Sequence, residues 1–305
     1  MVIKTGFKLF LSMGTLLLLI VIMFFISMNT GIIHLEPLEV LTTFIGNGTD
    51  KQNLILFEFR LPRIIIALLI GSGLAVSGAI LQGISRNGLA DPGILGINVG
   101  AGLAVVLFIY FTGGTAGISS SYTIFIMPFF AFIGASFAAF LIYILAWKEG
   151  VTPARLLLVG IAVAAGFGAI LIIFQLKMDP RDFMQATIWL AGSIWGTDWK
   201  FVIAVLPWII LLIPFAIYKG RVLDVLNLGD STAIGLGAFV ERERRVLIFI
   251  SVALAGSSVA VGGGIAFLGL VAPHIARRLV GPKHQLLPWL DRFYYWLQTL
   301  LEDQF

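Results

Sequence analysis

Long uninterrupted apolar segments are the feature of this sequence that most limits how it can fold. A helix needs about 20 apolar residues to cross a bilayer, whereas a strand of an outer-membrane barrel alternates apolar and polar residues over about ten. The runs here do not alternate, so the sequence predicts an all-α, polytopic transmembrane helix bundle of about eight spans. Apolar runs of crossing length lie at 9–28, 62–84, 94–111, 122–147, 154–174, 201–218 and 246–262, with a shorter run at 265–279.

The composition excludes a water-soluble protein. Hydrophobic residues make up 59% of the chain and charged residues 12%, with a mean hydropathy of +1.02. Soluble domains average about 45–50% and about 25%, so the charges are too few to solvate a globule. The net charge is only +4 and the basic residues lie in short loops, which argues against nucleic-acid binding. The absence of cysteine excludes disulfides, thiolate nucleophiles and Cys-ligated metals.

The first apolar run fits either a secretory signal or a first transmembrane helix. It follows Lys4 and Lys8 and exceeds the usual signal core of about 7–15 residues, and no A-x-A-like cleavage site follows it. We interpret it as a retained span. With the N-terminus inside, about twice as many lysines and arginines fall in inner loops as in outer ones, so we expect a cytoplasmic N-terminus.

The predicted spans carry almost no charge, which bears on how a transporter would be energised. Between Ile94 and Phe174 the charged residues are Lys148, Glu149 and Arg155, all at one short inner turn. Ion-coupled carriers keep ionisable groups inside the membrane, and no Walker A sequence is present for ATP hydrolysis. A proton-coupled carrier would require an essential charge inside a span. We therefore expect a separate subunit to supply the energy for any uphill transport.

The motifs of enzymes and metal sites are missing as well. The three histidines lack H-E-x-x-H spacing, and no G-x-S-x-G sequence occurs. We expect no enzyme activity, no bound metal and no cofactor. His274, beside Pro273 near a helix end, is expected to form a capping or hydrogen-bonding contact.

Small residues recur four positions apart in several spans. Gly96, Gly100 and Ala104 form one such row, and Gly134 with Ala138 forms another. This spacing lets helix backbones approach closely in lipid, so we interpret these rows as packing surfaces.

Two arginines stand at the predicted outer mouth of the second span, in the sequence Arg60-Leu61-Pro62-Arg63. A proline in the first turn of a helix costs no intrahelical hydrogen bond, so we expect Pro62 to begin the helix and to hold both arginines at the surface. Two guanidinium groups there suit bidentate pairing with carboxylates of an external partner. The alternative is that both side chains extend to lipid head groups.

A long polar segment, 219–245, follows the sixth predicted span on the inner side. Within it, Asp230 or Ser231 is expected to cap a short helix that Gly235 or Gly237 ends. Such a helix suits contact with a soluble subunit. A solvated interfacial helix without a partner is the alternative.

Four motifs in order give the sequence a resemblance to a known family. They are RLPR, GAILQGISRNGLADPGILG, WLAGSIWGTDW and GGIAFLGLVAPHIARRLVGPKH, within roughly residues 5–288. The sequence resembles the FecCD-type permeases, the membrane subunits of ATP-binding-cassette (ABC) importers for ferric siderophores, haem and cobalamin. The resemblance implies a bacterial plasma-membrane permease for an iron-siderophore or related chelate.

The resemblance also implies partners and site residues. Members carry about ten helices and pair as homodimers or with a homologue. They receive substrate from an extracytoplasmic binding protein and sit on two cytoplasmic ATPases. Arg60 and Arg63 match the positions where acidic residues of the binding protein dock. The segment 228–237 matches the family's ATPase-coupling segment, which assigns coupling to Leu228, Gly229, Asp230, Ala233, Gly235 and Gly237.

The sequence departs from the family pattern at two places. Gly88 stands where the family usually has proline, which glycine can accommodate in a loop. Relatives continue through two more spans after about residue 288, whereas 289–305 reads WLDRFYYWLQTLLEDQF, which cannot cross a bilayer. We expect a permease domain at 1–288 and a divergent tail at 289–305. A truncated or frameshifted, non-transporting fragment is the alternative function.

Overall fold

The computed structural model describes residues 14–15, 17–27, 35–113, 123–148, 150–194 and 196–280. Throughout this part the regular elements are helical, apart from one isolated bridge between Trp147 and Val151, which confirms the all-α prediction. An apolar helix, Leu17–Ser27, comes first. It is followed by α2 (Pro37–Phe44), α3 (Asp50–Asn53), the π-helix η1 (Leu54–Arg60), α4 (Leu61–Ser85), α5 (Ile97–Thr112), α6 (Thr123–Ala146), α7 (Pro153–Gln175), α8 (Pro180–Ala191), α9 (Trp199–Asn227), α10 (Asp230–Gly235), α11 (Val240–Gly262) and α12 (Leu268–Val280).

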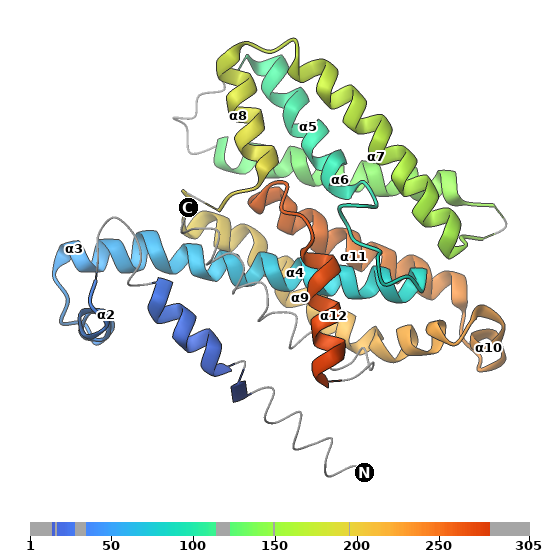
Figure 1. The fold of residues 1–305 in the computed structure, drawn as a ribbon, viewed down its shortest axis with the longest axis horizontal. Coiled ribbons are helices and arrows are strands. Elements are labelled where there is room, and N and C mark those ends of the chain that lie inside the picture. Colours follow the sequence, from blue (N-terminus) through green and yellow to red (C-terminus); the bar gives the residue numbers. More distant parts are fainter. Residues whose placement is uncertain are drawn as a thin grey trace.

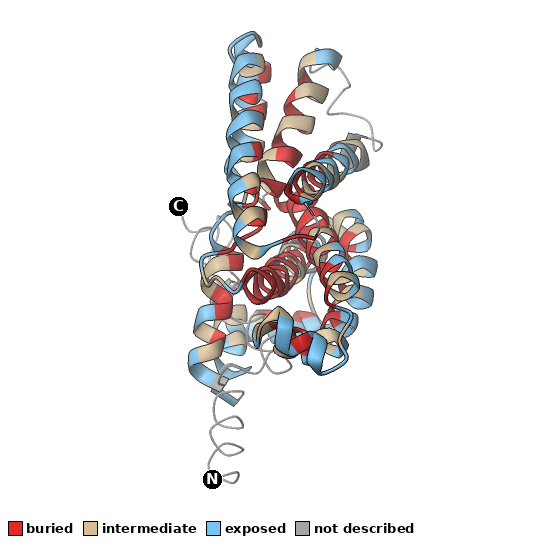
Figure 2. Ribbon diagram, turned by 90° about the vertical axis from the view of Figure 1, so that its right-hand side faces the viewer, coloured by how far each residue is buried: buried red, intermediate tan, exposed pale blue. Residues whose placement is uncertain are grey.

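The centre of the fold is the helix α4, which runs across the middle of Figure 1 and continues without a break from α3 and η1. Every residue in 70–85 is buried, and this part of the helix is red at the centre of Figure 2, which views it end-on. A helix that is apolar on all sides requires neighbours all around it. Helices α9, α11 and α12 provide them.

Helices α5, α6, α7 and α8 form a second group beside α4, at the top of Figure 1. Within it α5 and α6 meet at the predicted rows of small residues: a methyl group added at Gly100 would lie 2.6 Å from the Gly134 carbonyl oxygen and 2.5 Å from the Ala138 methyl group. Any larger side chain at Gly100 would therefore force the two helices apart. The packing interpretation is confirmed at this crossing.

Helices α7 and α9 present wide apolar faces to the outside. In their most apolar windows only 22% and 28% of the residues are buried, against 83% for the helix that contains α4. Exposed side chains such as Leu158, Ile172 and Leu211 are more than half accessible. Surfaces of this kind are stable against lipid or another apolar chain.

The spans differ in length from the sequence prediction. Within the described residues, five helices are long and apolar enough to cross a membrane. The predicted spans at 94–111 and 265–279 are the shorter helices α5 and α12, because 86–96 and 263–267 form irregular backbone instead. Much of 86–96 is buried against protein, where irregular backbone is tolerated in membrane proteins. Part of the first predicted span and the whole tail 289–305 lie outside the described residues.

The long helix gives the bundle two distinct ends. Helices α2 and α3 lie at one end of it, which we call the α3 end. Helix α10 lies at the opposite end of the molecule in Figure 1, which we call the α10 end. The two sets of site residues predicted from the sequence therefore belong to opposite ends of one bundle.

Candidate functional site

The predicted short helix at the α10 end is present, with its limits set by glycines. Gly229 precedes the helix with φ 109°, and Gly237 follows it with φ 85°, both in the left-handed region that favours glycine. The helix runs from Asp230 to Gly235, as the sequence indicated. The capping prediction was wrong, because Gly229 occupies the N-cap position and the Asp230 side chain is used elsewhere.

Asp230 lies between two arginines from distant parts of the chain. Arg86, at the end of α4, donates to Asp230 Oδ1 through Nη2. Arg244, on α11, donates through Nη2 to both carboxylate oxygens, at 3.1 Å to Oδ1 and 3.0 Å to Oδ2. Charge-assisted hydrogen bonds of this kind are stronger than neutral ones. We call Asp230, Arg86 and Arg244 the Asp230 clamp.

The arginines of the clamp also bind backbone and a second carboxylate. Arg244 Nη1 donates to the Val151 carbonyl oxygen at 2.6 Å and to Glu241 Oε1 at 2.8 Å, and its side chain is only 3% exposed. Arg86 Nε donates to the Leu226 carbonyl oxygen at 3.1 Å. Both terminal nitrogens of the buried Arg244 guanidinium thus have carboxylate or carbonyl partners, as a buried charge requires.

The clamp determines the charge state of Asp230. Partial burial by itself would raise the pKa of the Asp230 carboxyl. The hydrogen bonds and charges of Arg244 and Arg86 outweigh this effect, so its pKa lies below the ordinary value of 3.8. The carboxylate is therefore ionised at any physiological pH.

The remaining predicted coupling residues divide between two faces of the α10 segment. Ala233 is fully buried against the bundle, while Leu228 is 62% exposed. Three further apolar side chains that the sequence prediction did not include are also exposed: Ile234 and Leu236 at 64%, and Phe239 at 75%. Apolar residues within a polar segment between two spans were the signal that identifies them. We call Leu228, Ile234, Leu236 and Phe239 the outer face of the α10 segment.

The arginines at the α3 end lie in a different setting from the predicted one. The helix does not begin at Pro62: Thr49 caps it, by accepting from the Gln52 backbone N–H, and it runs from Asp50 through the π-helix into α4. Arg60 and Arg63 are half-buried on it, with Arg60 Nη1 and Arg63 Nε shielded from solvent. At 1.5 Å per residue they stand about 38 and 33 Å from Ser85, roughly the thickness of a bilayer core.

Pro62 accounts for a contact that the sequence did not predict. The Leu61 N–H donates to the Leu56 carbonyl oxygen in the π-helical pattern, which leaves the Phe57 carbonyl facing residue 62, a proline with no N–H. The indole N–H of Trp199 donates to the Phe57 oxygen at 2.8 Å and satisfies it. Trp199, the last residue of the third motif, therefore fixes the turn that precedes Arg60.

In the fourth motif, Pro273 also leaves a backbone carbonyl without its helical donor, and a distant side chain donates to that carbonyl instead. Pro273 lies inside α12 and cannot donate to the Gly269 carbonyl oxygen. Gln82 Nε2, from α4, donates to that oxygen at 3.0 Å, and Arg277 donates to Gln82 Oε1. His274 contacts the Gly88 carbonyl oxygen through Nε2 at 2.8 Å, so the predicted hydrogen-bonding role is confirmed. The second and fourth motifs are thus joined by several hydrogen bonds.

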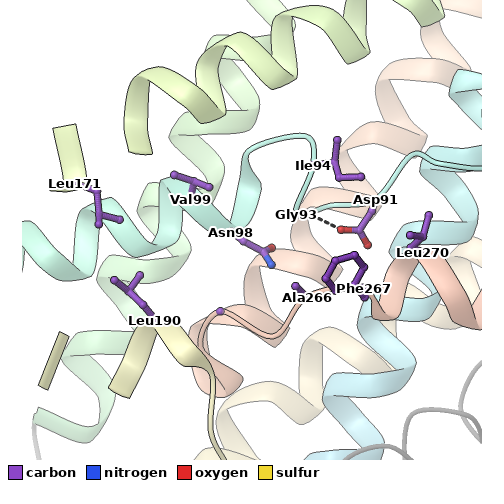
Figure 3. Close-up of a pocket in the computed structure, with 11 residues that line it drawn as sticks. Asp91, Gly93, Ile94, Asn98, Val99, Leu171, Leu190, Ala266, Phe267 and Leu270 are labelled. Carbon is purple, nitrogen blue, oxygen red and sulfur yellow. Dashed lines mark hydrogen bonds between the residues drawn. The ribbon is translucent and has the colours of Figure 1, made fainter. Parts of the chain in front are cut away.

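A cavity of about 330 Å³ opens where the loop 86–96, α5, α8 and the segment before α12 meet. Figure 3 shows Asp91, Asn98 and Phe267 around it, with apolar side chains on the other sides. Asp91 is 5% exposed, and its Oδ2 accepts from the Gly93 N–H at 2.8 Å. Asn98 Nδ2 donates to the Ile265 carbonyl oxygen at 3.0 Å. The cavity is mainly apolar with a few fixed polar groups, as small-molecule sites are.

No group of three or more metal-ligating side chains occurs in the part of the chain that the structure describes. The two predicted sets of site residues are not brought together: the α10 segment and the two arginines lie at opposite ends of α4. The arrangement suits contacts with separate partners at the two ends and a path for a small molecule between them.

Comparisons with known proteins agree with this arrangement. A family model described as the FecCD transport family matches residues 18–291. Over 291 residues the chain is 59% identical to the "Iron(3+)-hydroxamate import system permease protein FhuG" of Bacillus subtilis (strain 168), covering 95% of this chain and 87% of that protein. It is 36% identical over 280 residues to the "Hemin transport system permease protein HmuU" of Yersinia pestis, covering 91% and 82%.

A solved structure matches at the level of the fold as well. It is described as a metal-chelate type ABC transporter in an inward-facing conformation, and the similarity has a TM-score of 0.84 at 28% sequence identity. The match covers 96% of this chain and 89% of the other.

Proposed function

The chain belongs to the FecCD transport family, and on that premise we propose that it imports an iron(III)-siderophore complex of the hydroxamate class. It is a multi-pass permease of an ABC importer of the plasma membrane and not an enzyme. The observation that supports the cargo most is the 59% identity, over 95% of the chain, to a permease named for iron(3+)-hydroxamate import. The permease domain would comprise residues 1–288, with 289–305 as a divergent tail.

The ATPase subunits would bind at the α10 end. The apolar side chains on the outer face of the α10 segment are exposed, and such side chains suit the buried centre of a protein interface. In this proposal Ile234, Leu236 and Phe239 contact the ATPase, together with Leu228. Gly229, Gly235 and Gly237 shape the segment, and Asp230 and Ala233 hold it to the bundle. The α10 end and the N-terminus would then be cytoplasmic.

The extracytoplasmic binding protein would dock at the α3 end. Arg60 and Arg63 lie a bilayer's thickness from the α10 end, and both guanidinium groups suit acidic side chains of a partner. Their half-buried position restricts their orientations, which favours bidentate pairing with fixed carboxylates. The exposed apolar faces of α7 and α9 would contact lipid and a second permease, identical or homologous.

The docking role is tested with purified permease in lipid nanodiscs and the cognate binding protein. Arg60→Glu with Arg63→Glu should weaken binding about tenfold or more, because each change opposes an acidic partner with a like charge. Arg181→Glu, at an exposed position of α8, is the matched control and should leave affinity unchanged. Unchanged affinity in the double variant would refute the assignment.

The cargo is tested by uptake of ferric chelates in cells that lack their own hydroxamate permease. Cells expressing this chain with its cognate ATPase and binding protein should accumulate ferric hydroxamates in preference to ferric catecholates. Accumulation of neither chelate would favour the non-transporting alternative, and a preference for catecholates would contradict the proposed cargo class.

A further inference from the structure

The Asp230 clamp connects α10 to four other parts of the bundle. Arg86 attaches Asp230 to the end of α4, and Arg244 attaches it to α11. Through Arg244 Nη1 the clamp reaches Val151 in the turn between α6 and α7, and through Arg86 Nε it reaches Leu226 at the end of α9. Asp230 is the residue of α10 at which all these contacts meet.

The two arms of the clamp have different surroundings. The Arg244 side chain is 3% exposed, so removing its carboxylate partner would leave a buried charge under-compensated. The Arg86 side chain is 33% exposed and can be solvated if its partner is lost. Arg244 therefore secures α10 to the bundle, while Arg86 is a separable connection to α4.

Arg86 is followed in the chain by the loop that lines the cavity. Arg86 is the C-cap residue of α4, and its backbone has φ 49°. This left-handed conformation is unfavourable for residues other than glycine. The loop after it is held by its own backbone hydrogen bonds, from Ala90 N to Asn87 O at 3.1 Å and from Leu95 N to Asp91 O at 3.0 Å. Since these bonds hold the loop and it follows directly after Arg86, we expect it to move together with the end of α4. Its residues Asp91, Gly93 and Ile94 line the cavity.

We propose that the Asp230–Arg86 ion pair is the joint that transmits displacement of α10 to α4 and to the cavity-lining loop. This inference rests on the proposed function, in which an ATPase moves α10. When α10 shifts, Arg244 keeps Asp230 attached to α11, and the ion pair between Asp230 and Arg86 moves the end of α4 as well. Asp230 and Arg86 are thus positioning residues, since neither touches the cargo or the ATPase in this scheme.

A second ion pair at the same end provides a matched control. Lys219 Nζ and Glu243 Oε2 lie 2.6 Å apart and join α9 to α11, with side chains 16% and 18% exposed. This pair is comparable in charge and more buried than the Arg86–Asp230 pair, but its ion pair joins α9 to α11 and does not include a residue of α10. Loss of either pair costs stability, whereas only the Arg86–Asp230 pair should affect coupling.

The experiment measures transported cargo per ATP hydrolysed. The assembled complex of permease, cognate ATPase and binding protein is placed in liposomes, and radiolabelled ferric chelate uptake and ATP hydrolysis are measured per complex. Arg86→Gln should leave ATPase co-purification and hydrolysis within about twofold of wild type and should lower cargo per ATP about tenfold. In Arg86→Lys, which keeps the positive charge but not the planar guanidinium group, cargo per ATP should lie between the values for wild type and Arg86→Gln. Glu243→Gln should leave the ratio unchanged.

Each other result counts against the proposal. An unchanged ratio in Arg86→Gln would overturn it, and so would loss of ATPase co-purification, since that result assigns the pair to docking. If the Arg86→Gln permease fails to fold, so that it cannot be purified on its own, Arg86→Lys decides, because wild-type coupling in that variant with intact assembly would also overturn the proposal. Failure of the proposed function is seen separately, as absence of ATP-dependent uptake by the wild-type complex.

Discussion

Two prolines of the sequence motifs each leave a backbone carbonyl without its helical donor, and a side chain from a distant motif supplies the hydrogen bond. Trp199 donates to Phe57 across 142 positions, and Gln82 donates to Gly269 across 187. The prolines are visible in the sequence, and so is the loss of a donor. Which side chain replaces it depends on how the helices pack, so neither pairing could be predicted from local pattern.

Trp199→Phe tests the first of these contacts. The change keeps an aromatic ring but removes the indole N–H, so the Phe57 carbonyl oxygen loses the donor that it has in the turn before Arg60. A buried acceptor left without a donor costs about 1–3 kcal/mol. We expect a corresponding fall in thermal stability of the detergent-solubilised permease. Trp208→Phe is the control, because Trp208 packs against Phe132 with ring centroids 5.1 Å apart. Equal effects of the two substitutions would contradict the assignment.

The pH dependence of the clamp follows from the lowered pKa of Asp230. A carboxyl whose pKa is lowered on folding stabilises the protein above its unfolded pKa and loses that effect as the pH falls through the folded value. The stability difference between wild type and Asp230→Asn should therefore be constant from neutral pH down to about 5 and shrink only below the ordinary value of 3.8. A difference that disappears between pH 7 and 5, measured by thermal unfolding, would contradict the ion-pair geometry.

Helix α10 shows how much of an element the sequence can predict. The helix ends at Gly235, and Gly237 follows it in the left-handed region, so the predicted end is confirmed, whereas Gly229 was not predicted as the N-cap. The sequence also suggested Asp230 as a cap, which is the usual role of aspartate before a helix. The structure assigns that carboxylate to Arg86 and Arg244 instead. Arg86 comes from the second motif and Arg244 from α11, 14 positions after Asp230, so only the assembled bundle reveals that both bind this carboxylate.

The outer face of the α10 segment is the predicted contact with the ATPase, and a charged substitution there should weaken this contact. Ile234→Glu places a charge among exposed apolar side chains and should weaken ATPase binding about tenfold, as loss of a central interface residue does. Ser231→Glu adds the same charge at an exposed polar position of the same helix and should have a smaller effect. Affinity of detergent-solubilised permease for the purified ATPase measures both. A larger effect at Ser231 would place the interface on another face of α10.

At the scale of the whole molecule, hydropathy predicted the helical bundle but not the length of every span. Residues 94–96 and 265–267, at the starts of two predicted spans, form irregular backbone instead of helix. Hydropathy cannot distinguish apolar residues buried against protein from those that face lipid. Similarly, the burial of α4 and the exposure of α7 and α9 follow from which helices surround which, although all three are strongly apolar. The position of the cavity between helices α5, α8 and α12 also required the packed structure.

The central claim is that this permease provides a path for its cargo and takes its energy from a separate ATPase. The most apolar 18-residue window of each described span holds at most two charged residues, and α10 offers a contact for such a subunit at one end. The direct test is accumulation of ferric hydroxamate by liposomes that contain the permease and the binding protein, with and without the ATPase and ATP. We predict accumulation only with both ATPase and ATP. Accumulation by the permease without the ATPase, driven by a proton or sodium gradient, would contradict this account.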